Sequence, residues 1–224
     1  MIFLKKLEGL KKIGNPIIFR TDMQKGRLEI YLLRHGETEW TLSGQHTGRT
    51  DLSLTEEGKR QALLLKKRIQ EIPFSAVFSS PLKRSLETCH IACPNHQPII
   101  ETDAKEWDYG QYEGKVRADI LQANPTWDLF IQGAPQGESP DQVAQRADRL
   151  IELFIRQKGP VALFSHGHFL RILAARWIQL NVEKGKHFAL SVASLSLLSF
   201  EHAHTRVIQI WNDTHHLFHT PFDK

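Results

Sequence analysis

Two histidines in this 224-residue chain each follow an apolar run and precede a glycine. His35 stands in the run LLRHG, and His166 stands in the run LFSHG. A neutral histidine ring nitrogen can act as a nucleophile. Arg34, directly before His35, could bind phosphate oxygens through its planar set of donors. Taken alone, a histidine after a strand is more often an ordinary polar residue, so the interpretation depends on the rest of the chain.

Two further residues complete a possible set for cleaving a phosphate ester. That reaction needs an in-line nucleophile, cations around the phosphoryl oxygens and an acid for the leaving oxygen. Arg84, in the run SSPLKR, begins a predicted helix after a predicted strand, and Glu106, in EWDYG, is a candidate acid. Each alone would be a surface arginine or a solvated carboxylate. Together with His35, Arg34 and His166 they predict phosphoryl transfer.

The elements that must position these residues alternate between strands and helices, which indicates an α/β fold with a mostly parallel sheet. In such sheets, ligands bind beyond the carboxyl ends of the strands, so neighbouring strands would aim both histidines into one crevice. Strands are predicted at 28–33, 76–78, 98–101, 161–164, 195–200 and 206–211. Helices are predicted at 55–70, from 81 to about 92, after the N-cap Ser139 and at 168–179, with short ones near 115–123 and 125–131.

Composition predicts a single soluble globular domain, because 41% of the residues are hydrophobic and 24% are charged. The two cysteines, Cys89 and Cys93, match no common redox or zinc motif, which favours reduced thiols and a cytoplasmic location. The net charge of +4 comes from scattered residues, which fits an anionic substrate better than nucleic acid. No apolar run is long enough for a signal peptide or a membrane span, so stable membrane association is not expected.

We predict three segments along the chain. Residues 1–27 form an N-terminal extension of uncertain structure, residues 28–212 form the domain, and residues 213–224 form a polar C-terminal tail. Histidines in that tail are a weak signal for a metal, so we expect no metal and no cofactor. The strand at 195–200 is a candidate for a sheet edge, where two chains could pair, which leaves a homo-oligomer open.

Spaced blocks over about residues 28–212 resemble the histidine phosphatase superfamily, whose fold is phosphoglycerate-mutase-like. That resemblance implies a three-layer α/β/α sandwich with a mostly parallel central sheet. Several motifs in the right order are far more specific than one RHG triplet. The blocks are LLRHGETEW, GQHTGRTDLSL, SSPLKR, EWDYGQYEG, GES and SHGH, starting at positions 32, 44, 79, 106, 137 and 165.

The resemblance implies a role for each candidate residue. His35 would take the phosphoryl group while Arg34, Arg84 and His166 hold its oxygens. Glu106 would protonate the leaving alcohol and then deprotonate the attacking water, with no metal. Thr41 stands where the family often has asparagine, which puts the detail of its contact in doubt. Substrate binding is predicted for Thr41, Gln45, Thr47, Gly48 and His168.

The runs around Trp40, Glu106 and His168 resemble a subgroup that contains yeast sedoheptulose-1,7-bisphosphatase. A phosphatase acting on a small phosphorylated substrate, such as a sugar phosphate or bisphosphate, is therefore our first hypothesis. A phosphoglycerate mutase is the alternative, disfavoured because the stretch between Gly114 and Ser139 leaves little room for a lid. A non-catalytic phosphate-binding module is disfavoured because all five chemical residues are present.

Overall fold

The computed structural model describes residues 28–202 and 204–218 of the chain. The predicted extension at 1–27 and the part of the predicted tail from 219 to 224 lie outside these described residues.

A six-stranded sheet in the order β3-β2-β4-β1-β5-β6 forms the middle of the molecule. β2 pairs in parallel with β3 and β4, and β4 pairs in parallel with β1. β5 pairs antiparallel with both β1 and β6. The strands are β1 (Glu29–Arg34), β2 (Ala76–Ser79), β3 (Ile99–Ile100), β4 (Pro160–Ser165), β5 (Leu195–Glu201) and β6 (Thr205–Asp213).

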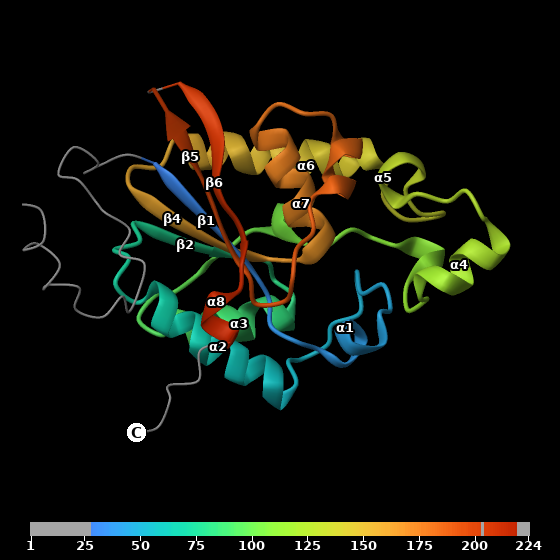
Figure 1. Cartoon of the computed structure of the whole chain (residues 1–224), viewed down its shortest axis with the longest axis horizontal. Coiled ribbons are helices and arrows are strands. Elements are labelled where there is room, and N and C mark those ends of the chain that lie inside the picture. Colours follow the sequence, from blue (N-terminus) through green and yellow to red (C-terminus); the bar gives the residue numbers. More distant parts are fainter. Residues whose placement is uncertain (1–27, 203, 219–224) are drawn as a thin grey trace, which may run out of the picture.

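Helices cover both faces of this sheet, which confirms the predicted three-layer α/β/α architecture (Figure 1). On one face lie α6 (Pro140–Ile155) and α7 (Gly167–Trp177), and on the other lie α2 (Glu56–Ile69), α3 (Lys83–Ala92) and α8 (His215–Phe218). Within the part of the chain described, no helix is long and apolar enough to cross a membrane. The smaller helices are α1 (Glu39–Ser43), η2 (Thr102–Ala104), η3 (Gly110–Tyr112), α4 (Arg117–Ala123), α5 (Leu129–Gln132) and η4 (Val182–His187).

The apolar run of β1 is explained by its central place in the sheet. A strand buried on both faces needs apolar residues at every position, and alternate side chains then serve opposite faces. Ile30 and Leu32 belong to the core beneath α6 and α7, whereas Tyr31 and Leu33 belong to the core beneath α2 and α3. The sheet therefore separates two apolar cores, each sealed by one helical layer.

The helix starts follow their capping residues. Thr55 accepts a hydrogen bond from the backbone of Gly58 at the start of α2. Ser139 and Gln142 form the predicted capping box at the start of α6, with Pro140 in the first helical position. Both helices therefore begin where the sequence places them.

The register of β1 and β4 brings the two histidine motifs together. Arg34 lies opposite Ser165 in this parallel pair, so His35 and His166 follow at the same edge of the sheet. The backbone N–H of His35 donates to the carbonyl of Ser165 over 3.0 Å. The two strands are therefore parallel neighbours, which is the condition under which both histidines face one crevice.

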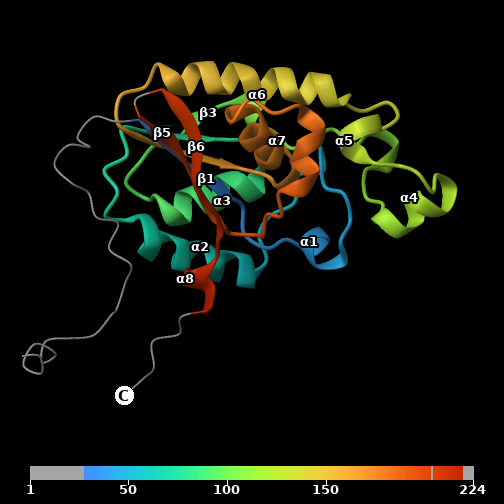
Figure 2. The same cartoon turned by 45° about the horizontal axis from the view of Figure 1, so that its top comes forward.

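Two expectations about the end of the chain differ from the structure. β5 does not lie at a sheet edge, because β6 pairs with it on the side away from β1 and takes the edge position. β6 continues to Asp213, and α8 follows on the α2 side of the sheet (Figures 1 and 2). Residues 213–218 are thus part of the folded domain rather than of a tail.

Candidate active site

A cavity of about 520 Å³ opens where β1 and β4 end. One of its walls comes from the segment that carries α4 and α5, which extends past the end of the sheet in Figure 2. The predicted residues that line the cavity are Arg34, His35, Thr41, Gln45, Thr47, Glu106 and His168. Arg84, His166 and Gly48 do not line it, and they lie behind its surface.

His35 is held by one ring nitrogen, and the other has no hydrogen-bond partner within the described part of the chain. Its Nδ1 lies 2.7 Å from the carbonyl oxygen of Gly36, and a carbonyl only accepts, so Nδ1 carries the proton. Burial, together with the charges of Arg84 and Arg34, holds the pKa of His35 well below its usual range. The ring is therefore neutral at pH 7, and Nε2 keeps the lone pair that a nucleophile needs.

Arg34 lies across the first residue of α7. A Cβ at Gly167 would lie 3.1 Å from Arg34 Cζ, so only glycine leaves the guanidinium this close to the helix start. Arg34 Nη1 donates to the carbonyl of Leu190, whereas the buried Nε has no partner among the described residues. The residue nevertheless lines the cavity, so its charge lies close to any anion that binds there.

Arg84 is fully buried and almost saturated with protein acceptors. Its Nη1 donates to the carbonyl of Thr50, and its Nη2 donates to the carbonyls of Thr47 and Gly48. Its Nε donates to Nδ1 of His166 over 3.2 Å. Since a guanidinium has five N–H groups, these contacts leave one N–H of Nη1 without a partner among the described residues.

His166 is neutral and acts as the acceptor in that contact. Burial comes first among the causes that hold its pKa well below the usual range, followed by the charge of Arg84. Because Nδ1 accepts from Arg84, Nε2 carries the proton and lies 2.8 Å from Ser80 Oγ. Both ring nitrogens are thus used inside the protein, and the ring centroid lies 5.2 Å from that of His35.

The loop that supplies the carbonyls around Arg84 is fixed by Glu113. Its carboxylate accepts hydrogen bonds from the backbone N–H of Gly48 and of Thr50. A Cβ at Gly48 would lie 2.4 Å from the carbonyl oxygen of Trp107, so the loop packs tightly there. Gly48 and Thr47 therefore position Arg84 through their backbones. Sequence reasoning gave Glu113 no role of its own.

Thr41 and Gln45 use their polar groups locally. The hydroxyl of Thr41 accepts from Thr38 N and donates to Thr38 O, completing the capping box of α1. Gln45 donates to the carbonyl of Gly114 over 2.8 Å. Both residues line the cavity, but these contacts also give each a structural role.

Glu106 lies over the amino-terminal end of α7, where helix N–H groups attract negative charge. Its carboxylate accepts hydrogen bonds from the backbone N–H of His168 at 3.0 Å, of Phe169 at 2.8 Å and of Trp107 at 2.9 Å. The side chain is buried at 8% exposure and still lines the cavity. It is therefore fixed at the same strand edge as His35.

A partly buried ion pair braces the segment that carries Glu106. Arg146 donates to both carboxylate oxygens of Glu138, at 2.7 and 2.8 Å. It also donates to the carbonyls of Asp103 and Lys105. The GES block at the start of α6 therefore acts through Glu138, as a support for the Glu106 segment.

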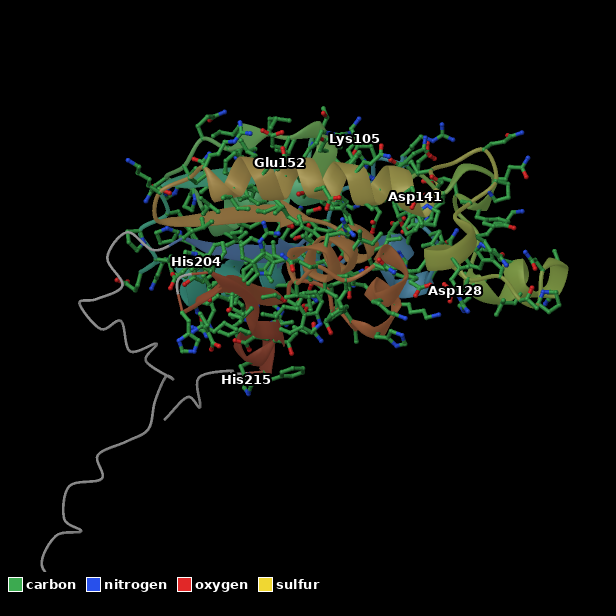
Figure 3. The ribbon with its side chains drawn as sticks, turned by 90° about the horizontal axis from the view of Figure 1, so that it is seen from above. Lys105, Asp128, Asp141, Glu152, His204 and His215 are labelled. Atoms are coloured by element: carbon green, nitrogen blue, oxygen red, sulfur yellow. The ribbon has the colours of Figure 1, made fainter. Side chains whose placement is uncertain are left out.

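The far wall of the cavity is aromatic and basic. Arg117 lies over the ring of Trp127, and Arg171 lies 4.6 Å from the ring centroid of Phe130. Lys186 pairs with Asp128, which Figure 3 marks beside α5. The segment between Gly114 and Ser139, which is expected to have little room for a lid, supplies α4, α5 and their connection to this wall.

Among the described residues, no group of histidine, cysteine, aspartate and glutamate side chains has the arrangement of a metal site. His215, at the surface in Figure 3, bonds to Asp213, and His216 bonds to the carbonyl of Ala193. Both cysteines are free and buried, and burial raises the pKa of the Cys93 thiol to about 12.

Comparison with known proteins places the chain in a family of enzymes. The model of the histidine phosphatase superfamily, branch 1, matches residues 30–214. An acid phosphatase of Mycobacterium tuberculosis is 39% identical over 177 residues, covering 77% of this chain and 87% of the relative. Sedoheptulose 1,7-bisphosphatase of Saccharomyces cerevisiae is 29% identical over 185 residues, covering 68% of each chain.

A solved structure agrees with these matches. The product of an open reading frame of Mycobacterium tuberculosis superimposes with a TM-score of 0.78 at 36% identity. The match covers 82% of this chain and 96% of the other.

Proposed function

Because the chain belongs to the histidine phosphatase superfamily and is a phosphatase, we propose that it hydrolyses a small phosphomonoester through a phosphohistidine on His35, without a metal ion. The observation that carries this proposal is the neutral ring of His35, whose Nδ1 donates to the carbonyl of Gly36 and whose Nε2 makes no hydrogen bond to any described residue. The guanidinium of Arg34, which lines the cavity together with His35, supplies a cation for the transferred group.

In the first step, His35 Nε2 attacks phosphorus and the bond from phosphorus to the ester oxygen breaks. Glu106, in its protonated form, gives its proton to the leaving alkoxide, so an alcohol departs. In the second step, Glu106 takes a proton from water as that water attacks phosphorus. The P–N bond breaks, inorganic phosphate leaves, Glu106 is protonated again and His35 returns to its neutral state.

Charge on the transferred group is stabilised by fixed cations rather than by a metal. Arg34 lines the cavity, and the charges of Arg34 and of the buried Arg84 both act on the site, since both lower the pKa of His35. His166 holds Arg84 in place as an acceptor. Preorganised donors of this kind each contribute about 10²–10³ in rate.

The far wall supports a sugar phosphate or bisphosphate as the substrate class. Arg171 donates only to the backbone carbonyls of Gly185 and Lys186 among the described residues, and Arg117 has no carboxylate partner among them. Their charges are available to a second anionic group, and the aromatic rings beneath them can pack against a carbon chain. The relative named sedoheptulose 1,7-bisphosphatase is consistent with this choice.

The wall formed by α4 and α5 favours keeping phosphoglycerate mutase activity as the alternative. A mutase must hold its product while the phosphoryl group returns to it, and a well-walled site assists that step. Mutase activity requires a bisphosphoglycerate primer, whereas hydrolysis does not.

The test is phosphate release from a panel of esters in the presence of EDTA, with His35→Ala beside the wild type. The panel contains p-nitrophenyl phosphate, sedoheptulose and fructose bisphosphates, 3-phosphoglycerate and a nucleotide. We expect release that the variant loses, and an alkali-stable, acid-labile phosphoryl label on His35. Folded wild-type protein that releases phosphate from none of these esters would contradict the proposal, and interconversion of phosphoglycerates only with primer would favour the mutase.

A further inference from the structure

The phenol of Tyr109 and the ring of His168 form a close pair at the wall of the cavity. Tyr109 Oη lies 2.6 Å from His168 Nδ1, and both residues line the cavity. Tyr109 is 2% exposed, so its hydroxyl is held almost entirely within the protein. The catalytic scheme above makes no use of this pair.

The direction of this hydrogen bond follows from the ionisation of its two partners. Burial and the charge of Glu106 raise the pKa of Tyr109 well above its usual value, so the phenol keeps its proton. A buried hydroxyl needs an acceptor, and His168 Nδ1 is the partner that the described residues provide. Burial, followed by the charges of Arg171, His46, Arg34 and Arg117, holds the pKa of His168 well below its usual value.

A neutral imidazole that accepts at Nδ1 must carry its proton on Nε2. His168 Nε2 makes no hydrogen bond to any residue that the structure describes, and the ring lines the cavity. The ring is also fixed in orientation, because it lies parallel to that of His46 at 6.1 Å and edge-on to Phe130 at 5.5 Å. It therefore presents one N–H donor to whatever occupies the cavity.

The backbone of His168 ties this donor to the proposed acid. Its N–H donates to Glu106 Oε2, so the imidazole belongs to the residue that holds the carboxylate serving the leaving oxygen. Phe130 of the far wall packs edge-on against the ring at 5.5 Å, and the charge of Arg171 also acts on the ring. Since Glu106 is the proposed acid for the leaving oxygen, we expect this donor to lie closer to the leaving alcohol than to the transferred phosphoryl group.

We propose that His168 Nε2–H binds an acceptor oxygen on the carbon skeleton of the leaving alcohol, and that Tyr109 is a positioning residue that fixes His168 in this tautomer. This inference rests on the proposed phosphatase function and makes the enzyme selective for esters of polyhydroxylated alcohols over esters of plain alcohols. Tyr109 acts through His168 and does not itself touch the reacting atoms.

A matched pair of substrates tests the selectivity. Glycerol 2-phosphate and isopropyl phosphate share a secondary carbon skeleton, but only the first has hydroxyls beside the ester. We expect Tyr109→Phe to lower kcat/KM for glycerol 2-phosphate roughly three- to tenfold more than for isopropyl phosphate, the size of one neutral hydrogen bond. Tyr112→Phe removes a nearby phenol that does not line the cavity, and it should leave the ratio unchanged.

Two replacements of His168 separate the tautomer from the bulk of the ring. The amide N–H₂ of glutamine can take the place of Nε2–H, whereas that of asparagine reaches only the position of Nδ1. His168→Gln should keep the substrate ratio and His168→Asn should lose it. Tyr109→Phe added to His168→Gln should then have no further effect on the ratio, which a merely structural role for Tyr109 would not explain.

Two-bond ¹H–¹⁵N NMR on protein with ¹⁵N-labelled histidine reads the tautomer without any assay of activity. We expect His168, assigned by its loss in His168→Gln, to carry its proton on Nε2 in the wild type and to become mixed in Tyr109→Phe. A proton on Nδ1 in the wild type, or equal losses on both esters, would overturn the inference. Failure of all esters with the expected tautomer would instead refute the proposed phosphatase function.

Discussion

Arg84 Nε donates to His166 Nδ1 over 3.2 Å, and this contact joins two strand ends that the chain reaches far apart in sequence. Since arginine is never an acceptor, His166 must be unprotonated at Nδ1 for the contact to exist. The second histidine of the family pattern thereby acts as the anchor of the second arginine. We therefore propose that His166 contributes to the reaction by holding the guanidinium of Arg84 in place.

Replacement of this anchor should reduce turnover without removing the nucleophile. In His166→Phe the ring volume is kept, but Arg84 loses an acceptor and Ser80 loses a partner. We expect kcat to fall about 10²–10³-fold, the range for losing one preorganised donor. Steady-state kinetics on p-nitrophenyl phosphate measure this, with His90→Phe on the exposed side of α3 as the control. A loss below fivefold would show that Arg84 does not depend on His166.

The buried neutral histidines should make stability fall in acid. The folded-state pKa values of His35 and His166 lie well below the usual value of about 6.5. Below pH 6.5 the unfolded chain therefore binds protons that the folded protein does not bind. The free energy of unfolding is highest above pH 6.5 and decreases as the pH falls below that value. We expect each histidine to lower the free energy of unfolding at pH 5 by roughly 1–2 kcal/mol relative to its value above pH 6.5.

Urea unfolding at pH 7.5 and pH 5 measures the difference in free energy. His166→Phe lacks one of the histidines with a lowered pKa, so its stability should depend less steeply on pH than that of the wild type. An identical slope in the two proteins would mean that His166 is not neutral in the folded state.

Gly167→Ala should separate activity from stability. The new Cβ would lie 3.1 Å from Arg34 Cζ and 3.3 Å from Nε, so the guanidinium must move. Alanine also suits a helix better than glycine does. We expect kcat/KM to fall about tenfold or more, with no loss in the urea midpoint. Unchanged kinetics would show that the position of Arg34 tolerates this shift.

Glu113→Gln tests the support of the loop around Arg84. The carboxylate accepts from both Gly48 and Thr50, whereas an amide offers one oxygen and a competing donor. We expect about 1–2 kcal/mol of lost stability and a lower kcat on every ester. Glu39→Gln, an exposed change on α1, is the control for charge. A Glu113→Gln variant as stable and active as that control would show that Glu113 does not support the loop around Arg84.

Arg117→Gln tests the far wall. Arg117 makes its described contact with the face of Trp127 and is exposed, so the substitution should not disturb the fold. We expect the KM for fructose 1,6-bisphosphate to rise roughly three- to tenfold relative to that for p-nitrophenyl phosphate. Arg60→Gln, which removes an equal charge from the surface of α2, serves as the control. Equal changes in KM for both esters would show that Arg117 does not bind the second phosphate of the bisphosphate.

The fold was largely predictable because its signals are local. Apolar runs of the right length gave β1 and β4, and Ser139 with Gln142 fixed the start of α6. The position of β5 was not predictable, because its apolar pattern suits either an edge or an interior place. The interior position of β5 results from its pairing with β6. Such a pairing is a contact between two strands and cannot be read from the sequence of either strand alone.

The candidate site was predictable in its residue types but not in their division of labour. Motif order placed His35, Arg34 and Glu106 at one cavity. It could not show that Arg84 and His166 are bonded to each other, because hydrogen-bond direction depends on burial and on neighbouring charges. Tyr109 and Glu113 lay inside a recognised block, yet their partners come from other segments of the chain.

The sheet order has a consequence for how the enzyme is assembled. β4 is synthesised after β1, β2 and β3, yet it inserts between β1 and β2. A nascent chain that ends before β4 therefore lacks the strand that joins its two halves, and long-range pairing of this kind folds slowly. Division of the polypeptide at the loop before β4, near Gly159, would give two fragments with one histidine motif each. Recovery of turnover on mixing would then report directly on strand insertion.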